Sequence, residues 1–185
     1  MDNKEKTLTI SDNGIGMNEE DLKSSLGTIA RSGTKAFLEQ ISKSNKDKKT
    51  DMSMIGQFGV GFYASFMVAD DVEVISKKAG DSQAWKWSSD GKTGFNLVKA
   101  DKDNFGTSIL LKLKKDAKEF LEETRLQFIV RKYSDHISYP VKLSQKDKKD
   151  TEIKTLNEAS ALWTRPAKEI KDEQYQDCLL YTSDA

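Results

Sequence analysis

The N-terminal segment changes from a strand pattern to a helix pattern within a short stretch. In residues 6–10, KTLTI, the apolar residues Leu8 and Ile10 alternate with threonines, which predicts a half-buried β-strand. The next residues, SDNGIGMNEEDL, predict a tight turn, and Asn18 with the acidic residues after it predicts the capped start of a helix. We therefore expect a strand, a turn and a helix in that order.

The middle of the chain has a hydrophobic period of two. The stretches DVEVIS, AWKWSS, GFNLVKA and GTSILLKL alternate or run apolar, and the polar segments KKAGDSQ, SDGKT and DKDNF separate them. This pattern predicts successive antiparallel strands. Trp85 and Trp87 would lie on one face of the sheet, where we interpret them as packing residues rather than as a stack for a ligand.

Helical spacing returns in residues 116–137, DAKEFLEETRLQFIVRKYSDHI. The apolar positions recur at steps of three, one, three and four, which predicts a helix that covers a sheet; they are Leu126, Ile129, Val130, Tyr133 and Ile137. YPVKLSQ then predicts a last strand, and KDKKDTE a short polar linker. The segment ALWTRPAKEI begins a new part of the chain after this linker.

The composition narrows the class of protein. The 185 residues include 30 basic and 30 acidic side chains, so no net charge favours a nucleic-acid or membrane partner. No apolar run approaches the length of a membrane span, and the N-terminus lacks the apolar core of a secretory signal, so we expect a cytoplasmic protein. One cysteine, Cys178, and one histidine, His136, exclude a disulfide framework and argue against a Cys/His metal site.

The segment Gly56 to Ser65, GQFGVGFYAS, needs its own explanation. A glycine-rich turn that enters a helix can point backbone N–H groups at a phosphate, because those donors have no partner within the helix. No Lys-Ser or Lys-Thr follows the glycines, and no βαβ unit surrounds them, so neither the P-loop nor the dinucleotide fingerprint fits. Taken alone, the motif is equally consistent with an ordinary glycine-rich turn.

Two further motifs decide between these alternatives. DNGIGM, Asp12 to Met17, precedes the glycine motif, and Gly106-Thr107 opens a later strand; together the three resemble the GHKL nucleotide-binding fold. LGTIARSGTKAF, IGQFGVGFYASFMVAD, KYSDHISYPV and ALWTR resemble the heat-shock protein 90 chaperones of the bacterial HtpG type, from Leu8 to about Asp177. This resemblance implies a two-layer α/β sandwich, with a mixed, mostly antiparallel sheet covered by helices and with the family's N-terminal strand and helix missing.

The residues of DNGIGM have a physical reading beside the resemblance. A buried carboxylate at Asp12 could accept a hydrogen bond from the exocyclic amine of adenine, and the cost of an unpaired buried charge would then select adenine. An Asx-turn aspartate is the alternative. Gly14 and Gly16 would let the backbone approach the base, and Met17 would offer a flat apolar contact. By resemblance, Thr107 would bind near the adenine together with Asp12; otherwise it is an ordinary strand threonine.

The resemblance also implies the phosphate end of the site. Backbone donors of residues 59–62 would face the phosphates, Arg31 would lie near them, and a lid of about residues 26–55 would hinge at Gly27 and Gly33. Ser25 replaces a larger polar residue of the family, which leaves its ribose contact open. The full nucleotide-binding set is Asp12, Gly14, Gly16, Met17, Ser25, Leu26, Arg31, Gly56, Gln57, Phe58, Gly59, Val60, Gly61, Phe62 and Thr107.

The resemblance implies ATP and Mg²⁺ as cofactors but assigns no catalytic or metal-binding residue to this chain. In the family a Glu, with an Asn four residues on, lies on a helix upstream of the TLTI strand and serves hydrolysis and Mg²⁺ binding. Glu5 cannot replace this Glu, because it lies on the approach to a strand. We therefore expect ATP hydrolysis from a full-length parent rather than from this chain alone.

We expect four segments along the chain. Residues 1–143 would form a partial ATP-binding domain, residues 144–155 a charged linker, and residues 156–177 the start of a middle domain. The last eight residues, CLLYTSDA, resemble the translation of a sequencing adaptor, and we interpret residues 178–185 as an artefact; a genuine divergent tail is the alternative.

The expected function is that of an ATP-dependent chaperone that binds unfolded client proteins and whose full-length parent is a homodimer. Protein folding and the stress response are the processes that this implies. One alternative is another GHKL ATPase: a histidine kinase, a type II topoisomerase or a mismatch-repair ATPase. The other is a truncated module that binds nucleotide without hydrolysing it.

Overall fold

The computed structural model describes residues 1–27, 60–135, 137–145 and 153–158. Its chain divides into two compact units, one of Thr7–Ala117 and one of Met1–Lys6 with Lys118–Ala185. The larger unit contains the predicted strands and the DNGIGM turn. The predicted limits at residues 143 and 155 stay predictions, as does the interpretation of residues 178–185, which lie outside the described residues.

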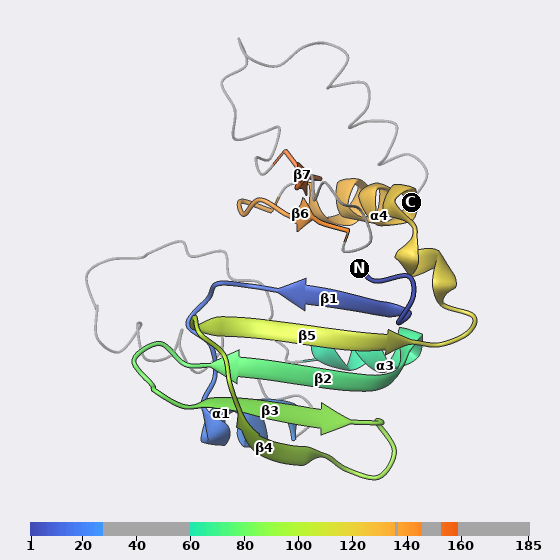
Figure 1. Ribbon diagram of the computed structural model, residues 1–185. Helices are drawn as coiled ribbons and strands as arrows, with labels where there is room; N and C mark the ends of the chain where they lie inside the picture. Colours follow the sequence, from blue (N-terminus) through green and yellow to red (C-terminus); the bar gives the residue numbers. More distant parts are fainter. Residues whose placement is uncertain (28–59, 136, 146–152, 159–185) are drawn as a thin grey trace. The chain divides into compact units, whose positions relative to one another are not determined.

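The larger unit is built on a five-stranded sheet in the order β1-β5-β2-β3-β4 (Figure 1). The strands are β1 (Thr7–Ser11), β2 (Ala69–Lys77), β3 (Ala84–Ser89), β4 (Asn96–Ala100) and β5 (Gly106–Leu113). All pairings within this sheet are antiparallel. The five strands predicted between residues 6 and 113 are therefore confirmed. Strand β5 lies between β1 and β2 rather than beside β4, which precedes it in the sequence.

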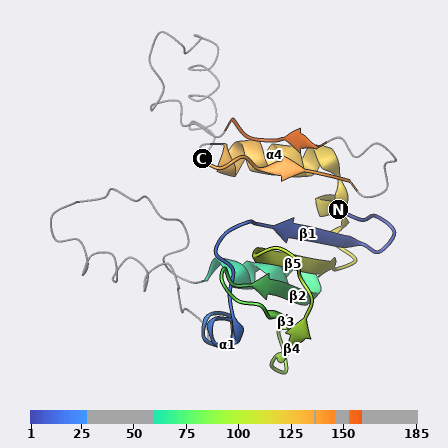
Figure 2. The same ribbon diagram turned by 60° about the vertical axis from the view of Figure 1, so that its left-hand side comes forward.

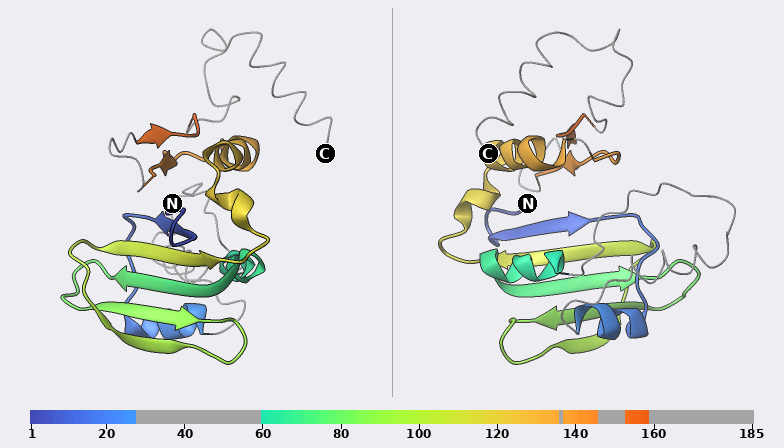
Figure 3. Two further views of the ribbon diagram at one scale, coloured as in Figure 1. Left: turned by 45° about the vertical axis from the view of Figure 1, so that its right-hand side comes forward. Right: turned by 180° about the vertical axis from the view of Figure 1, so that it is seen from behind.

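Helices lie on one face of this sheet. They are α1 (Glu19–Leu26), the 3-10 helix η1 (Gly61–Ala64) and α3 (Ser65–Val68), and the view from behind shows α1 and α3 over the same side (Figure 3). On this face Val72, Val74 and Ser76 of β2 are fully buried. Trp87 is 2% exposed and contacts the rings of Phe62 and Phe95, which confirms its role in packing.

The predicted cap of α1 is present in full. The side chain of Asn18 accepts a hydrogen bond from the Asp21 backbone N–H at 3.0 Å, and the Asp21 carboxylate accepts one from the Asn18 N–H at 3.2 Å. This reciprocal capping box satisfies two helix-end donors that the helix itself leaves unpaired. Leu22, fully buried, fixes α1 to the core.

The smaller unit contains the predicted late helix and a minimal sheet (Figure 2). Its elements are η2 (Lys118–Leu121), α4 (Glu123–Ser134), β6 (Lys142–Leu143) and β7 (Lys154–Thr155), with β6 and β7 antiparallel. The helix is confirmed, but α4 has no buried residue and Tyr133 is 63% exposed, unlike the covered stripe that we expected. The predicted last strand shortens to β6, and β7 lies within the predicted linker.

Asn157 organises the end of α4. Its side chain is almost fully buried, donates to the carbonyls of Ser134, Ile137 and Tyr139, and accepts from the Val141 N–H at 2.7 Å. One side chain thereby bonds the carbonyl of the last α4 residue, which the helix leaves without a partner, and two carbonyls of the segment that follows. Within the described ranges, no helix is long and apolar enough to cross a membrane.

Candidate functional site

The described structure contains ten of the fifteen residues predicted to bind nucleotide. Five lie outside it: Arg31, Gly56, Gln57, Phe58 and Gly59. The predicted lid lies almost entirely outside it as well. The predictions for these residues therefore stay predictions, and the site is built here from Asp12–Met17, Thr107 and the neighbours that hold them.

Asp12 and Thr107 are joined at the point where β1 leaves the sheet. The Asp12 N–H donates to the Thr107 carbonyl at 2.8 Å, and the Thr107 N–H donates to Asp12 Oδ1 at 3.3 Å. Oδ1 also accepts from the Gly14 N–H at 2.9 Å. These contacts fix the orientation of the carboxylate, and no group among the described residues donates to its other oxygen, Oδ2.

The expectation of a buried Asp12 carboxylate is wrong in this structure. Asp12 is exposed, because it lies in a surface turn and its Oδ1 folds back on the backbone of that turn. The bond to Gly14 is the Asx turn that the sequence left open as an alternative. Selection of a ligand by an unpaired buried charge therefore does not apply. Oδ2, to which no described residue donates, remains an oriented hydrogen-bond acceptor.

The glycines of the turn make room for the protein's own backbone. Gly16 has φ +67°, and a Cβ there would lie 1.9 Å from the Lys77 carbonyl oxygen. Gly106, at φ +111°, would place a Cβ 2.4 Å from the Asp12 carbonyl oxygen. Glycine at these positions lets the turn lie directly against the ends of β2 and β5. The close approach predicted for Gly16 is thus made to strand β2.

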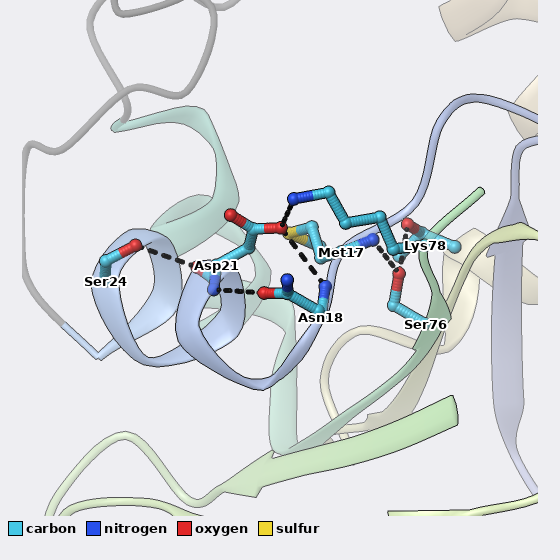
Figure 4. Close-up of polar contacts among 7 residues, drawn as sticks. Met17, Asn18, Asp21, Ser24, Ser76 and Lys78 are labelled. Atoms are coloured by element: carbon cyan, nitrogen blue, oxygen red, sulfur yellow. Dashed lines mark hydrogen bonds and ion pairs between the residues drawn. The ribbon is translucent and has the colours of Figure 1, made fainter. Parts of the chain in front are cut away.

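Ser76 of β2 contacts both the turn and β5, and Figure 4 shows its contact with Met17 of the turn. Its hydroxyl accepts from the Met17 N–H at 2.8 Å, lies 2.9 Å from Thr107 Oγ1 and lies 3.3 Å from the Gly106 carbonyl. Ser76 is fully buried and Thr107 is 7% exposed. Through Ser76, the backbone of Met17 is therefore held close to the Thr107 side chain.

A second link joins the β2–β3 turn to the start of α1. Lys78 Nζ lies 2.8 Å from Asp21 Oδ2, as Figure 4 shows, and the Ala79 N–H donates to the Ile15 carbonyl at 2.7 Å. The hydrogen bond to Asp21 raises the pKa of Lys78 above its usual value. Residues 76–79 thus contact the DNGIGMNEED segment along most of its length.

The described end of the glycine motif starts a helix, as predicted. Val60 is 54% exposed, and a Cβ on Gly61 would meet no atom within 4 Å. The Phe62 ring contacts Trp87 at 5.5 Å between centroids, with an edge-on orientation. The backbone at Gly61 is therefore open, while the next side chain anchors it to the core.

Ser25 and Leu26 end α1 close to this helix. Leu26 is 9% exposed, so its side chain belongs to the core, and its carbonyl accepts a hydrogen bond from the Tyr63 hydroxyl at 3.2 Å. Burial raises the pKa of Tyr63. Ser25 is half-buried, and its predicted contact with the ribose stays a prediction.

A cavity of about 400 Å³ lies elsewhere, beside β2, β3 and the turn before β4. Asp71, Glu73 and Asp90 are among its lining residues, and neither Asp12 nor Thr107 is. Glu73 there is engaged by Lys86 and Lys112 across the strands. We place the candidate site at Asp12 and Thr107, because an oriented carboxylate oxygen is available there. Over the described ranges, no group of three His, Cys, Asp or Glu side chains could hold a metal ion.

Two residues that sequence reasoning missed hold this site together: Ser76 and Lys78. Ser76 had a detectable signal, because it is the polar member of the inward-facing series with Val72 and Val74. A polar residue at a core position of a strand indicates a specific hydrogen-bond partner. Lys78 gave no such signal, since its partner Asp21 is distant in the sequence.

An antiparallel sheet with helices on one face, and an Asp-Asn-Gly turn bonded to a strand threonine, are the features of a GHKL-type ATP-binding domain. Residues 1–119 match the family described as histidine kinase-, DNA gyrase B- and HSP90-like ATPase, and the chain belongs to this family. The resemblance drawn from the motifs is thereby confirmed.

Curated relatives narrow the comparison. The chain is 52% identical over 185 residues to the chaperone protein HtpG of Roseobacter denitrificans, covering 100% of this chain and 28% of that protein. It is 52% identical over 177 residues to HtpG of Rhodospirillum rubrum, and the match covers 96% of this chain and 28% of that protein. For HtpG of a Sulfurovum species the identity is 51% over 187 residues, and the match covers 95% of this chain and 30% of that protein. The chain therefore spans less than a third of the length of these relatives.

Proposed function

We propose that this chain is the ATP-binding part of an ATP-dependent chaperone of the HtpG type. The family match over residues 1–119 and the identity to HtpG proteins support this proposal. The single structural observation that carries it is the Asp12 carboxylate, which two backbone N–H groups hold through Oδ1 while no described residue donates to Oδ2.

The adenine end of ATP fits this arrangement. Asp12 Oδ2 accepts a hydrogen bond from the exocyclic amine, and Thr107 binds beside it. A hydrogen bond to a charged acceptor is stronger than one between neutral groups, so Asp12 contributes most of the base recognition. Met17 provides an apolar contact for the ring, since its backbone is fixed by Ser76.

The phosphates would lie against the backbone of the glycine motif, Gly56 to Phe62, with Arg31 nearby. The exposure of Gly61 supports this, because a Cβ built there would meet no atom within 4 Å outside its chain neighbours. Mg²⁺ belongs to the proposal only through the family resemblance. Among the described residues, no group of three His, Cys, Asp or Glu side chains could hold it.

The activities of a protein as long as the relatives are proposed from the same resemblance. They are ATP hydrolysis, binding of unfolded client proteins, homodimer formation and a cytoplasmic role in protein folding under stress. The evenly balanced charges give no reason to expect a nucleic-acid or membrane partner. We favour the chaperone over a kinase or topoisomerase of the same family, because the similar proteins named above are chaperones.

Calorimetric titration of the 185-residue chain with ATP tests the proposal, with GTP as the matched control ligand. We expect heat of binding with ATP, a weaker response with GTP, and a rise in melting temperature that follows the ATP concentration. A chain that is folded by circular dichroism, yet gives neither heat nor a thermal shift with ATP, would refute nucleotide binding.

A second measurement separates the chaperone from other members of the family. The encoded protein, produced at the length of its relatives, should suppress the aggregation of a chemically unfolded test protein in an ATP-sensitive manner. Autophosphorylation on histidine, or ATP-dependent change in the supercoiling of plasmid DNA, would instead favour the other classes.

A further inference from the structure

Ser76 is a buried hydroxyl placed between the two parts of the proposed site. It is fully buried, and its Oγ lies within hydrogen-bond distance of the Met17 N–H, Thr107 Oγ1 and the Gly106 carbonyl. Met17 belongs to the turn that carries Asp12, whereas Gly106 and Thr107 belong to β5. One side chain therefore contacts both segments that would meet the base, and Figure 4 shows the contact with Met17.

The numbers of donors and acceptors restrict how these groups can bond. A serine hydroxyl has one proton and two lone pairs, and the Met17 N–H occupies one lone pair. If Ser76 donates to the Gly106 carbonyl, its second lone pair accepts the proton of Thr107, and every donor of the set is used. If Ser76 donates to Thr107 instead, the Thr107 proton has no acceptor among the described residues.

The first arrangement leaves no buried donor unpaired, and burial makes an unpaired donor costly. It directs the Thr107 proton at Ser76, away from any ligand. Thr107 Oγ1 then offers a ligand only lone pairs. Asp12 Oδ2 offers lone pairs as well, because an ionised carboxylate has no proton to donate.

We propose that Ser76 is a positioning residue that makes Thr107 a hydrogen-bond acceptor, so that the site prefers a base with an amino group over one with a carbonyl. The preference follows from chemistry: an amino group donates to an acceptor, whereas a carbonyl placed against it meets repulsion. This inference rests on the proposed binding of ATP and adds a cause for its base selectivity.

The test compares ATP with ITP, which carries a carbonyl in place of the adenine amine, on the full 185-residue chain. The measured quantity is the ratio of the ITP and ATP dissociation constants for the wild type and for Ser76→Ala. Without Ser76 the Thr107 hydroxyl can turn and donate to the ITP carbonyl. We expect the ratio to fall about threefold to tenfold, the equivalent of one hydrogen bond.

Ser76→Thr is the conservative control, since it keeps the hydroxyl, and we expect it to retain the wild-type ratio. A purely structural defect would weaken ATP and ITP binding together and leave their ratio unchanged. The double variant Ser76→Ala/Thr107→Val tests whether Ser76 acts through the Thr107 hydroxyl. If it does, the double variant has the same ratio of dissociation constants as Thr107→Val alone.

The outcomes separate this inference from the proposed function. A wild-type chain that fails to bind ATP overturns both. ATP binding with the same ratio in wild type and Ser76→Ala overturns the role of Ser76 alone. If Ser76→Ala does not fold, Thr107→Val replaces it, and an unchanged ratio in that variant likewise overturns the inference.

Discussion

Asp12 and Thr107 hold each other by a pair of hydrogen bonds, one from the Asp12 N–H to the Thr107 carbonyl and one from the Thr107 N–H to Asp12 Oδ1. The first bond continues the β1–β5 hydrogen-bond ladder by one residue beyond β1. In the second, the Asp12 side chain accepts the bond in place of a backbone carbonyl. The carboxylate is therefore oriented by the sheet itself. Any ligand that uses Oδ2 meets a group whose position is already fixed, which lowers the entropic cost of binding.

Replacing Asp12 by Asn should separate binding from folding. The amide oxygen can still accept from Gly14 and Thr107, but the other atom becomes an NH₂ donor that faces the adenine amine. We expect ATP affinity to fall by about tenfold or more while the free energy of unfolding changes by less than about 1 kcal/mol. Calorimetry and urea unfolding measure the two quantities; equal ATP affinity in variant and wild type would remove Asp12 from the site.

Three glycines provide a graded test of the backbone near the site. Gly16→Ala combines a left-handed φ with a clash against the Lys77 carbonyl, and we expect a loss of about 2 to 5 kcal/mol. Gly80→Ala has the left-handed φ of +90° but open space, and should cost about 1 to 2 kcal/mol. Gly61 has neither a left-handed φ nor a nearby atom. We expect Gly61→Ala to raise the free energy of unfolding slightly, by less than about 1 kcal/mol.

Urea unfolding of the three glycine variants ranks them by their free energy of unfolding. The steric account of the DNGIGM turn requires Gly16→Ala to be the most destabilised. If Gly16→Ala and Gly80→Ala cost the same, the close contact with Lys77 contributes nothing and only the backbone conformation matters.

The ion pair between Lys78 and Asp21 predicts a dependence on salt and pH. Its side chains are 37% and 38% exposed, so screening limits its contribution to about 0.5 kcal/mol. Because the pKa of Lys78 is raised above 10.5 in the folded state, the contribution is complete below that pH. It is lost as the pH rises through the folded pKa.

Asp21→Asn isolates this pair, because the amide oxygen can still cap the Asn18 N–H. We expect the variant to lose stability at neutral pH and low salt, and to approach the wild type at high salt and at strongly alkaline pH. A difference that persists unchanged in high salt would mean that the cap, rather than the charge, accounts for the loss.

The Tyr63 hydroxyl joins η1 to the last turn of α1, so Tyr63→Phe should destabilise the larger unit. Loss of its bond to the Leu26 carbonyl should cost about 1 kcal/mol. Tyr133→Phe, at a side chain that is 63% exposed, is the matched control and should stay within about 0.5 kcal/mol of the wild type.

An alkaline absorbance titration gives an independent measurement at Tyr63. Burial raises the pKa of Tyr63, so the component lost in Tyr63→Phe should titrate above the usual tyrosine value of 10.0. Since the raised pKa means that the folded state holds this proton more tightly, the associated stability is lost as the pH rises through that pKa. If the component lost in Tyr63→Phe titrates with an ordinary tyrosine pKa, Tyr63 is more exposed in solution than in this structure.

Most elements of the larger unit could be predicted from the sequence, because they depend on neighbours in the chain. Leu8 and Ile10 alternate with threonines and form β1, and Asn18 with Asp21 forms the capping box. The chemical type of neighbouring positions favours such local structure, so the sequence indicates it before the tertiary contacts are known. The family resemblance followed from the motifs in the same way.

The arrangement of the site could not be predicted, because its partners are distant along the chain. Whether Asp12 was buried or exposed depended on how its turn met β5, and the structure placed it at the surface. Gly16 was read as room for a ligand and instead makes room for Lys77. The stripe on α4 predicted a covered helix, yet none of its residues is buried.

The sequence by itself determined the strands of the sheet, the cap of α1, the change of period along the chain and the family, since each is written in residues close together or in motifs. Only the tertiary structure decided that β5 lies between β1 and β2, and that Ser76 meets both Met17 and Thr107. The physical reason is that strand order and buried hydrogen bonds depend on which distant segments pack together. A single hydroxyl in a strand has no preference for its partner until the sheet has formed.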